Sequence, residues 1–225
     1  MYRRKPSGNW PKRGKSIVYD KKQIAEKLKR WEAYLSRYTL PAWEELPGMP
    51  LYMEQVVCFL TKTLEFLPKE EGGSSVVTPV AINNYVRMRI MPPPQRKKYG
   101  RVHLAYLIMI CTLKQSLAIS YIQKILPPDL PEEILQVQYN DYVEKHRRVS
   151  RHCIGQMQFA AQDVLDPLCT NENAVSNLVT AAAIFSGFSN LLAVKLLDLL
   201  ETQPEPGAEA NQETCRKAPE GKEAD

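Results

Sequence analysis

VTPVAINNYVRMR (Val77–Arg89), followed closely by PPPQRKKY (Pro92–Tyr99), is the stretch that decides how this chain is interpreted. Thr78 is a favourable helix N-cap residue, and Pro79 fits the first helical position, where no amide hydrogen is needed. The three consecutive prolines cannot continue a helix. The stretch therefore predicts a short helix that starts at Pro79 and ends before Pro92.

The predicted helix has one mainly apolar side and one polar side at a period of 3.6 residues. The first side carries Ile82, Tyr85, Val86 and Arg89, and the second carries Asn83, Asn84 and Arg87. Asn can pair with adenine through two hydrogen bonds, and Arg can pair with guanine in the same way. The polar side therefore has the residue types that read base edges in duplex DNA.

A run of positive charge follows the prolines and predicts contacts to DNA phosphates. Together with the helix it gives the predicted DNA-binding residues, which are Asn83, Asn84, Arg87, Arg89, Arg96, Lys97, Lys98 and Tyr99. The alternative interpretation is an ordinary solvated helix, which also directs Asn and Arg outward.

Charge is distributed unevenly along the 225 residues. Residues 1–30 contain eleven Lys or Arg against Asp20 and Glu26, a net charge of +9, whereas residues 201–225 contain seven acids against three bases. The formal net charge of the whole chain is +5, so the basic excess belongs to the N-terminus. The five cysteines have no paired spacing, and no apolar segment follows the N-terminal charges, which favours a reducing cytoplasm and no secretory signal.

The chain divides into four predicted regions. A flexible basic arm spans 1–22, a helical winged helix-turn-helix domain spans 23–127, a C-terminal helical dimerisation or effector region spans 128–200, and a disordered tail spans 201–225. Apolar periodicity predicts helices at about 21–38, 51–67, 101–117, 120–126, 132–165 and 172–200. The fold class is all-α, and a two-stranded wing around residues 90–100 is the single expected exception.

The last predicted helix has two apolar stripes. One stripe consists of Val175, Leu178, Ala182, Phe185, Leu192, Leu196 and Leu199, and the other of Ile184, Leu191, Val194 and Leu197. Two stripes need two partners, which we expect to be the preceding helix and a second subunit of a homodimer. The uncharged run 178–194 is at the short edge of a membrane span. Interruption by Asn and Ser favours a buried soluble helix, and no membrane is expected.

Several sequence blocks resemble a known family. They are Leu51–Val56 (LYMEQV), Ile82–Val86 (INNYV), the three prolines, Lys97–Tyr99 (KKY) and His103–Leu107 (HLAYL). Over about 43–126 they resemble a bacterial domain-of-unknown-function family, number eighteen thirty-six, which in turn is similar to MerR-type winged helix-turn-helix regulators. The resemblance implies a DNA-binding regulator. This sequence has Gly100 where the family usually has Ser, which predicts a weaker start for the next helix.

Other kinds of site are not predicted. No arrangement of nucleophile, base and acid suggests an enzyme, and the grouping of His146, His152 and Cys153 lacks further metal ligands, so no catalytic residue, metal or cofactor is expected. Lys145, Arg148 and His152 fall on one side of a helix and suit either phosphates, an acidic effector or plain solvation. The expected function is a transcriptional regulator that binds duplex DNA and responds to an unknown effector. The alternative is a protein-interaction adaptor that uses the same helix face.

Overall fold

The computed structural model describes residues 20–68 and 77–201. Most of the predicted arm, residues 69–76 and the predicted tail beyond Glu201 lie outside these residues. Within them the chain forms helices and no strand, which confirms the all-α prediction. The helices are α1 (Lys21–Arg37), the 3-10 helix η1 (Trp43–Glu45), α2 (Met53–Thr63), α3 (Pro79–Arg87), α4 (Arg101–Leu113), α5 (Ile119–Ile125), α6 (Glu132–Ala160), α7 (Gln162–Leu165) and α8 (Ala174–Glu201).

Helix α4 is the centre of the hydrophobic core. All nine residues from His103 to Cys111 are buried, so this helix is covered on most sides. Side chains from η1, α2, α3, α5 and the first half of α6 complete the same cluster. Burial of this much apolar surface is the main stabilising contribution to the fold.

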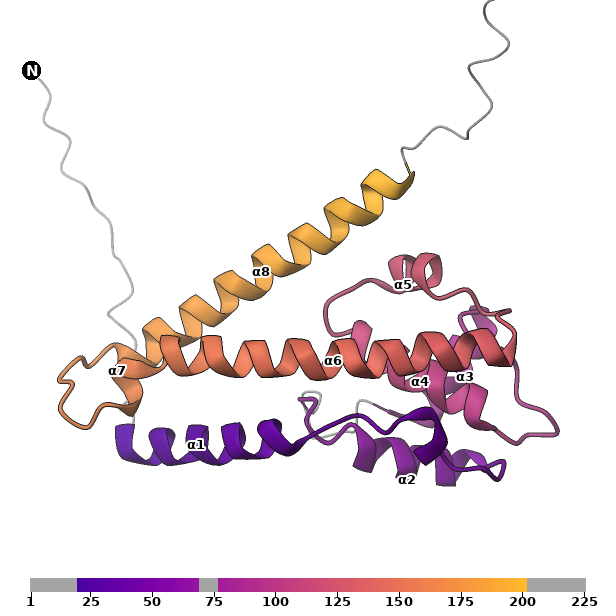
Figure 1. Ribbon diagram of the computed structural model, residues 1–225, viewed down its shortest axis with the longest axis horizontal. Helices are drawn as coiled ribbons and strands as arrows, with labels where there is room; N and C mark the ends of the chain where they lie inside the picture. Colours follow the sequence, from indigo (N-terminus) through magenta and orange to yellow (C-terminus); the bar gives the residue numbers. More distant parts are fainter. Residues whose placement is uncertain (1–19, 69–76, 202–225) are drawn as a thin grey trace, which may run out of the picture.

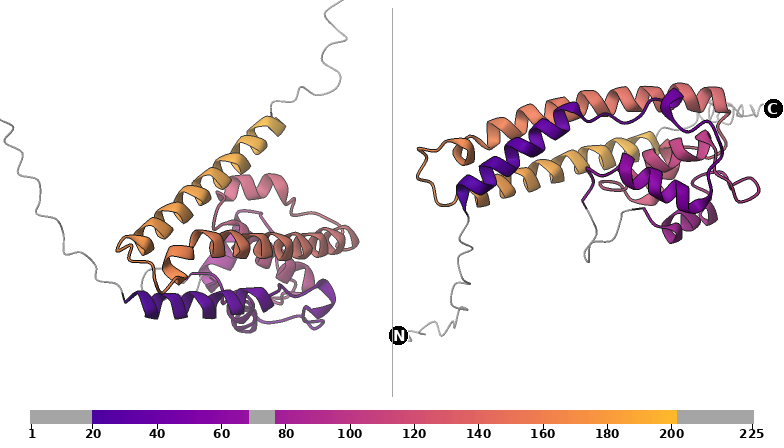
Figure 2. Two further views of the ribbon diagram at one scale, coloured as in Figure 1. Left: turned by 60° about the vertical axis from the view of Figure 1, so that its left-hand side comes forward. Right: turned by 90° about the horizontal axis from the view of Figure 1, so that it is seen from below.

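Helix α6 links this core to the rest of the molecule (Figure 1). Its first half places Leu135 and Tyr139 in the core, and the Tyr139 hydroxyl donates to the carbonyl of Pro41 at 2.9 Å. Its second half lies beside α1, as all views agree (Figure 2). The predicted boundary at 127/128 therefore does not separate two cores, because one core takes side chains from both sides of it.

One predicted helix start is confirmed and one predicted helix end differs from the structure. Helix α1 begins at Lys21, where the helix over 21–38 was predicted, because the Asp20 carboxylate caps it by accepting from the amide of Gln23 at 3.2 Å. The arm predicted over 1–22 therefore overlaps the first turn of α1. The single long helix predicted over 132–165 ends at Ala160, and α7 follows after Ala161. This break turns Val164 inward, where both Ala161 and Val164 are 2% exposed.

Helix α8 diverges from α6 and reaches toward α5 (Figure 1). The Asn190 amide donates to the carbonyl of Ser116, and the Tyr121 hydroxyl donates to Asp198 at 3.4 Å. Leu197, from the second predicted stripe, is buried. A large apolar surface is nevertheless exposed, including Phe188 at 70% and Leu192 at 62%. By length and composition alone, Ala174–Leu200 is apolar enough to cross a membrane, with 6% of its most apolar window buried.

Candidate nucleic-acid interface

Helix α3 starts as its sequence predicts. Thr78 accepts a hydrogen bond from the amide of Ala81 at 3.2 Å, and Pro79 occupies the first helical position. Ile82 and Tyr85 pack into the core, which leaves Asn83 and Arg87 exposed. The helix is therefore fixed by its apolar side and presents a polar side to solvent.

The polar side of α3 contains a preformed pair. The Arg87 guanidinium donates to the side-chain oxygen of half-buried Asn84 at 2.9 Å. Because its oxygen is already engaged, Asn84 is placed to orient Arg87 as much as to contact a ligand. Asn83 is the amide with the freer exposure on this helix.

Helix α3 ends in a Schellman motif that carries Arg89. The amide of Ile90 donates to the carbonyl of Tyr85 at 3.0 Å, and the amide of Arg89 donates to that of Val86 at 3.0 Å. Arg89 has a φ of 53°, the left-handed conformation that this motif requires, and its side chain is exposed. The sequence placed Arg89 on the apolar side of a continuing helix, which was wrong because the helix ends at Arg87.

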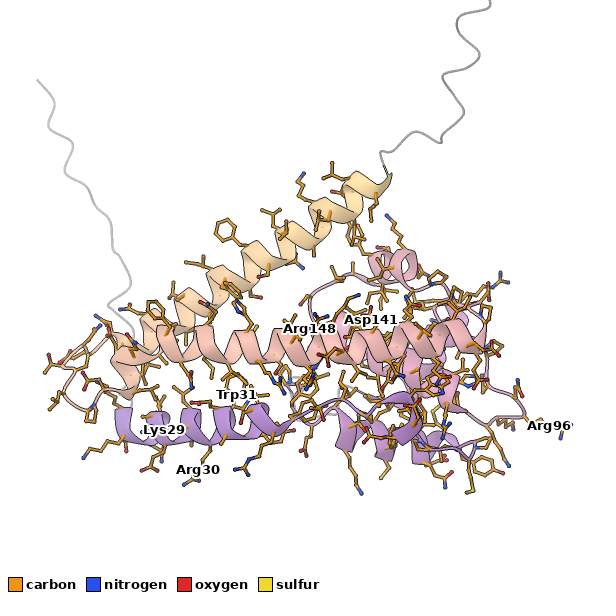
Figure 3. All side chains as sticks on the ribbon, viewed as in Figure 1. Lys29, Arg30, Trp31, Arg96, Asp141 and Arg148 are labelled. Atoms are coloured by element: carbon orange, nitrogen blue, oxygen red, sulfur yellow. The ribbon has the colours of Figure 1, made fainter. Side chains whose placement is uncertain are left out.

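The basic run forms one tight turn instead of a two-stranded wing. Gln95 and Lys98 exchange backbone hydrogen bonds at 3.0 and 2.9 Å, with Arg96 and Lys97 between them at φ values of 49° and 63°. Two central residues with positive φ define a type I′ turn, which usually holds Asn and Gly. Here it holds two exposed cations, and Arg96 projects at the edge of the molecule (Figure 3).

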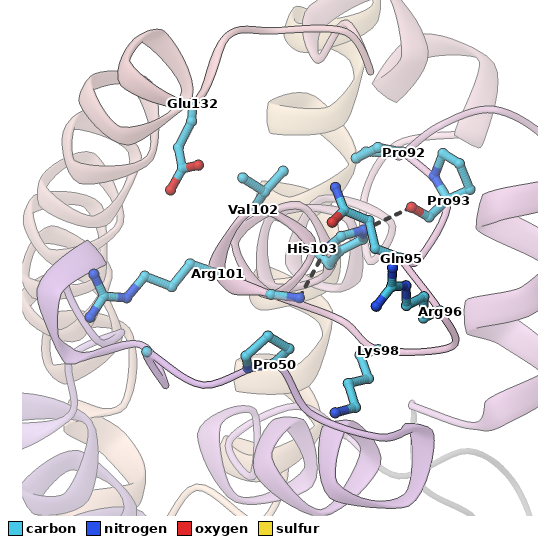
Figure 4. A pocket seen from close by; sticks show the side chains of 12 residues that line it. Pro50, Pro92, Pro93, Gln95, Arg96, Lys98, Arg101, Val102, His103 and Glu132 are labelled. Carbon is cyan, nitrogen blue, oxygen red and sulfur yellow. Dashed lines mark hydrogen bonds between the residues drawn. The ribbon is translucent and has the colours of Figure 1, made fainter.

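The turn is anchored to the core on both sides. Leu51 and Tyr99 exchange backbone hydrogen bonds at 2.9 Å, which fastens the chain after the turn to the start of α2. The imidazole of His103 accepts from the amide of Gly100 at 3.0 Å through Nδ1 and faces the carbonyl of Pro93 at 3.1 Å through Nε2 (Figure 4). With Nδ1 accepting, the neutral ring donates from Nε2 and connects the proline segment to α4.

A hollow of about 900 Å³ lies beside the turn (Figure 4). Arg96 and Lys98 are at one end of it, and Arg101 extends toward the other, where its Nε donates to the carbonyl of Leu46 at 3.1 Å. The Lys98 ammonium also lies 5.1 Å from the ring centroid of Tyr52. Glu132 is an acidic residue of the lining. The hollow thus adds Arg101 to the cations of the turn.

Tyr99 is the predicted contact residue that the structure puts in the core. It is 3% exposed, its ring meets His103 edge-on at 5.5 Å, and burial raises the pKa of its hydroxyl. The other seven predicted residues lie on α3, at its end or in the turn, and each of them is at least partly exposed.

The basic residues of α6 take part in ion pairs within the helix. Lys145 pairs with Asp141, and Arg147 makes two hydrogen bonds to Glu144 at 2.8 Å, which lower the pKa of that carboxyl. Arg148 lies 3.8 Å from the same carboxylate. This geometry favours the solvated face among the three interpretations of the cluster. In the part of the chain that the structure describes, no group of three metal-binding side chains comes together.

Sequence reasoning missed the contribution of His103. Gly100 has no side chain to cap α4, but the His103 imidazole accepts a hydrogen bond from the Gly100 amide, which is the bond that the N3 side chain makes in a capping box. A His three residues after a helix start is the signal that could have indicated this cap.

Comparison with known proteins gives a match to one family model, and this match does not indicate an activity. Residues 41–143 match the model of the family described as "Domain of unknown function (DUF1836)", which confirms the family resemblance over this segment. The match extends from just before η1 into α6 and so includes α3, the turn and most of the core. No curated protein and no solved structure matches the chain.

Proposed function

We propose that this protein is a duplex-DNA-binding transcriptional regulator and acts as a homodimer. In this proposal α3 is the recognition helix, α2 packs across it, and the turn 95–98 is a reduced wing related to that of MerR-type regulators. The two helices do contact each other. Residues 64–78 connect them, which is longer than the roughly three- to four-residue turn of the common helix-turn-helix motif.

The turn carries the proposal. Left-handed backbone costs about 1–2 kcal/mol for each residue with a side chain, so Gly or Asn would suit positions 96 and 97 better. Arg96 and Lys97 occupy them instead, with their side chains in solvent and the turn anchored on both sides. Strain of this kind is concentrated at functional sites. Two fixed cations at the edge of the molecule suit the phosphates of a duplex.

Each exposed residue receives a role in the proposal. Asn83 and Arg87 read base edges, with Asn84 orienting the Arg87 guanidinium through their 2.9 Å hydrogen bond. The positively charged residues that follow α3 contact phosphates. These residues are Arg89, Arg96, Lys97 and Lys98. Tyr99 supports the turn from within the core and contacts no DNA.

The proposed sequence preference is tested by selecting bound duplexes from a random pool with purified protein at near-physiological salt. The wild type should enrich one motif, and an inverted repeat is expected for a dimer. The N83A/R87A variant should bind with reduced sequence preference, because it retains the phosphate contacts and lacks the base contacts. An unchanged motif in this variant would contradict the assignment of α3. If the folded wild type binds no DNA at all, the result would favour the alternative function, a protein-interaction adaptor.

A further inference from the structure

A second pocket lies between α1, α6 and α8. Tyr38, which follows the end of α1, and Phe66, which follows the end of α2, also line it. Its volume is about 810 Å³, within the range of about 300–1,000 Å³ typical of small-molecule sites. Its walls are mostly apolar, and Trp31, Val149, Met157 and Phe185 are among them. Trp31 is on the side of α1 that faces α6 (Figure 3). Most of this lining falls outside the segment that matches the family model.

His146 is the polar group that stands out in this pocket. The rings of Tyr38, Phe66 and Tyr142 surround it, with centroid distances of 6.4, 5.6 and 6.4 Å. Among the described residues, none forms a hydrogen bond with the imidazole of His146. Every fully buried side-chain nitrogen in these residues has a partner, so the ring nitrogens of His146 are not fully buried and are accessible for a hydrogen bond. Burial lowers the pKa of His146, so the ring is neutral at pH 7.

The charges beside the pocket are compensated. Lys145, which is part of the lining, is paired with Asp141 one turn earlier on α6. The other walls are mainly aromatic and aliphatic, so the pocket lacks a cluster of charged side chains that could bind a strongly ionic ligand. The lining also includes the hydroxyl of Ser150 and the amide of Gln156. The imidazole of His146 lies among the aromatic rings of the pocket and, in its neutral form, can accept or donate one hydrogen bond to a polar atom of the ligand.

We propose that this pocket binds a small, uncharged, largely aromatic molecule that has one hydrogen-bonding group directed at His146. The aromatic walls provide apolar contact area, and the neutral imidazole fixes the orientation of the ligand. Because the walls belong to α1, α6 and α8, the ligand holds α8 against the rest of the molecule. The proposal is independent of DNA binding and can fail or succeed without it.

The pocket is tested with N-phenyl-1-naphthylamine, a neutral fluorescent probe that has one N–H group. The wild type should bind it saturably, with one probe per chain. In A182W a large ring fills the space beside Ala182, which lines the pocket, and affinity should fall at least tenfold. V179W is the matched control, because Val179 is on the same helix, is 63% exposed and does not line the pocket. Equal binding by all three proteins, or fluorescence that never saturates, would overturn the proposal.

The role of His146 is tested by a pair of probes and a single variant. H146F preserves a ring and removes the hydrogen bond, so affinity for N-phenyl-1-naphthylamine should fall roughly two- to tenfold. Affinity for 1-benzylnaphthalene, in which CH₂ replaces N–H, should not change. Equal effects on both probes would contradict the proposed hydrogen bond.

Thiol labelling tests binding of the probe to the pocket in the wild-type protein, without any substitution. Cys153 lines the pocket and is exposed, whereas Cys58 is exposed on α2, away from it. A saturating amount of probe should slow the reaction of a maleimide with Cys153 and leave Cys58 unaffected, as measured by mass spectrometry of peptides. Unchanged labelling of Cys153 would place the probe elsewhere and overturn the proposal, even if A182W failed to fold.

Discussion

At the scale of single residues, Arg96 and Lys97 have a backbone conformation that costs stability. Both residues have positive φ, and neither is Gly or Asn. A sequence chosen for stability alone would place Asn-Gly at these positions of a type I′ turn. The proposed phosphate contacts would explain why Arg96 and Lys97 occupy these positions despite the strain of the turn.

The R96N/K97G variant should be more stable than the wild type. Relief of left-handed strain at two positions should raise the free energy of unfolding by about 1 kcal/mol or more, once the greater freedom of Gly in the unfolded chain is subtracted. For a protein of this size, 1 kcal/mol corresponds to a rise in Tm of about 2–4 °C. Thermal unfolding by circular dichroism measures it. A lower Tm would show that the turn is not strained.

His146 predicts how stability depends on pH. Burial lowers its pKa below the ordinary value of 6.5, so the unfolded chain takes up a proton at a higher pH than the folded protein does. The stabilising contribution is complete above pH 6.5 and is lost as the pH falls through 6.5 toward the lower pKa of the folded state. The midpoint of urea unfolding should therefore decrease between pH 7.5 and 5.5.

The matched variants isolate this effect. In H146F the decrease between the two pH values should be smaller, because no imidazole titrates in the pocket. H152F changes an exposed histidine of the same helix and should retain the decrease of the wild type. Identical pH dependence in wild type and H146F would refute the assignment to His146.

At the scale of elements, helix α8 presents a large exposed apolar surface within the described residues. Phe188, Leu192 and Leu199 share one side of it and are 70%, 62% and 62% exposed. Contiguous apolar surface of this kind marks an interaction site. Within the proposed function, the second subunit of the homodimer covers it.

The variant F188N/L192N/L199N should convert a dimer into a monomer. Its mass by light scattering should be half that of the wild type, whereas V179N, on the opposite side of α8, should remain dimeric. A wild type that is monomeric at all concentrations would contradict dimerisation through α8. Sedimentation of the wild type with phosphatidylcholine–phosphatidylglycerol vesicles would instead assign α8 to a membrane.

The sequence patterns predicted the helices better than the contacts between residues that are far apart in the sequence. Thr78 and Pro79 set the start of α3 through local chemistry, and apolar periodicity predicted where α4 starts. The end of α3 at Arg87 comes before the three prolines and is set by the backbone hydrogen bonds of its C-terminal cap. The cage around His146 was not predictable, because Tyr38, Phe66 and Tyr142 are far apart in sequence. The buried position of Tyr99 also depends on a nonlocal contact, its backbone pairing with Leu51.

At the scale of the whole molecule, α6 connects the two ends. Its first half belongs to the core that supports α3 and the turn, and its second half forms a wall of the His146 pocket. The proposed DNA-binding surface and the proposed ligand pocket thus share one continuous helix. Under these proposals, occupancy of the pocket would act directly on α8, the helix proposed to dimerise, and a change in dimerisation would alter binding to two half-sites.

The most direct test of DNA binding through the turn is the salt dependence of duplex affinity for three proteins. These are the wild type, R96N/K97G, and K29Q/R30Q, which removes the same charge from exposed positions of α1, far from Arg96 (Figure 3). Each phosphate contact contributes about −0.9 to the slope of log affinity against log salt. We expect R96N/K97G to be at least as stable as the wild type and to have a slope that is shallower by almost 2, whereas K29Q/R30Q should retain the slope of the wild type. Equal slopes for wild type and R96N/K97G would contradict DNA binding through the turn.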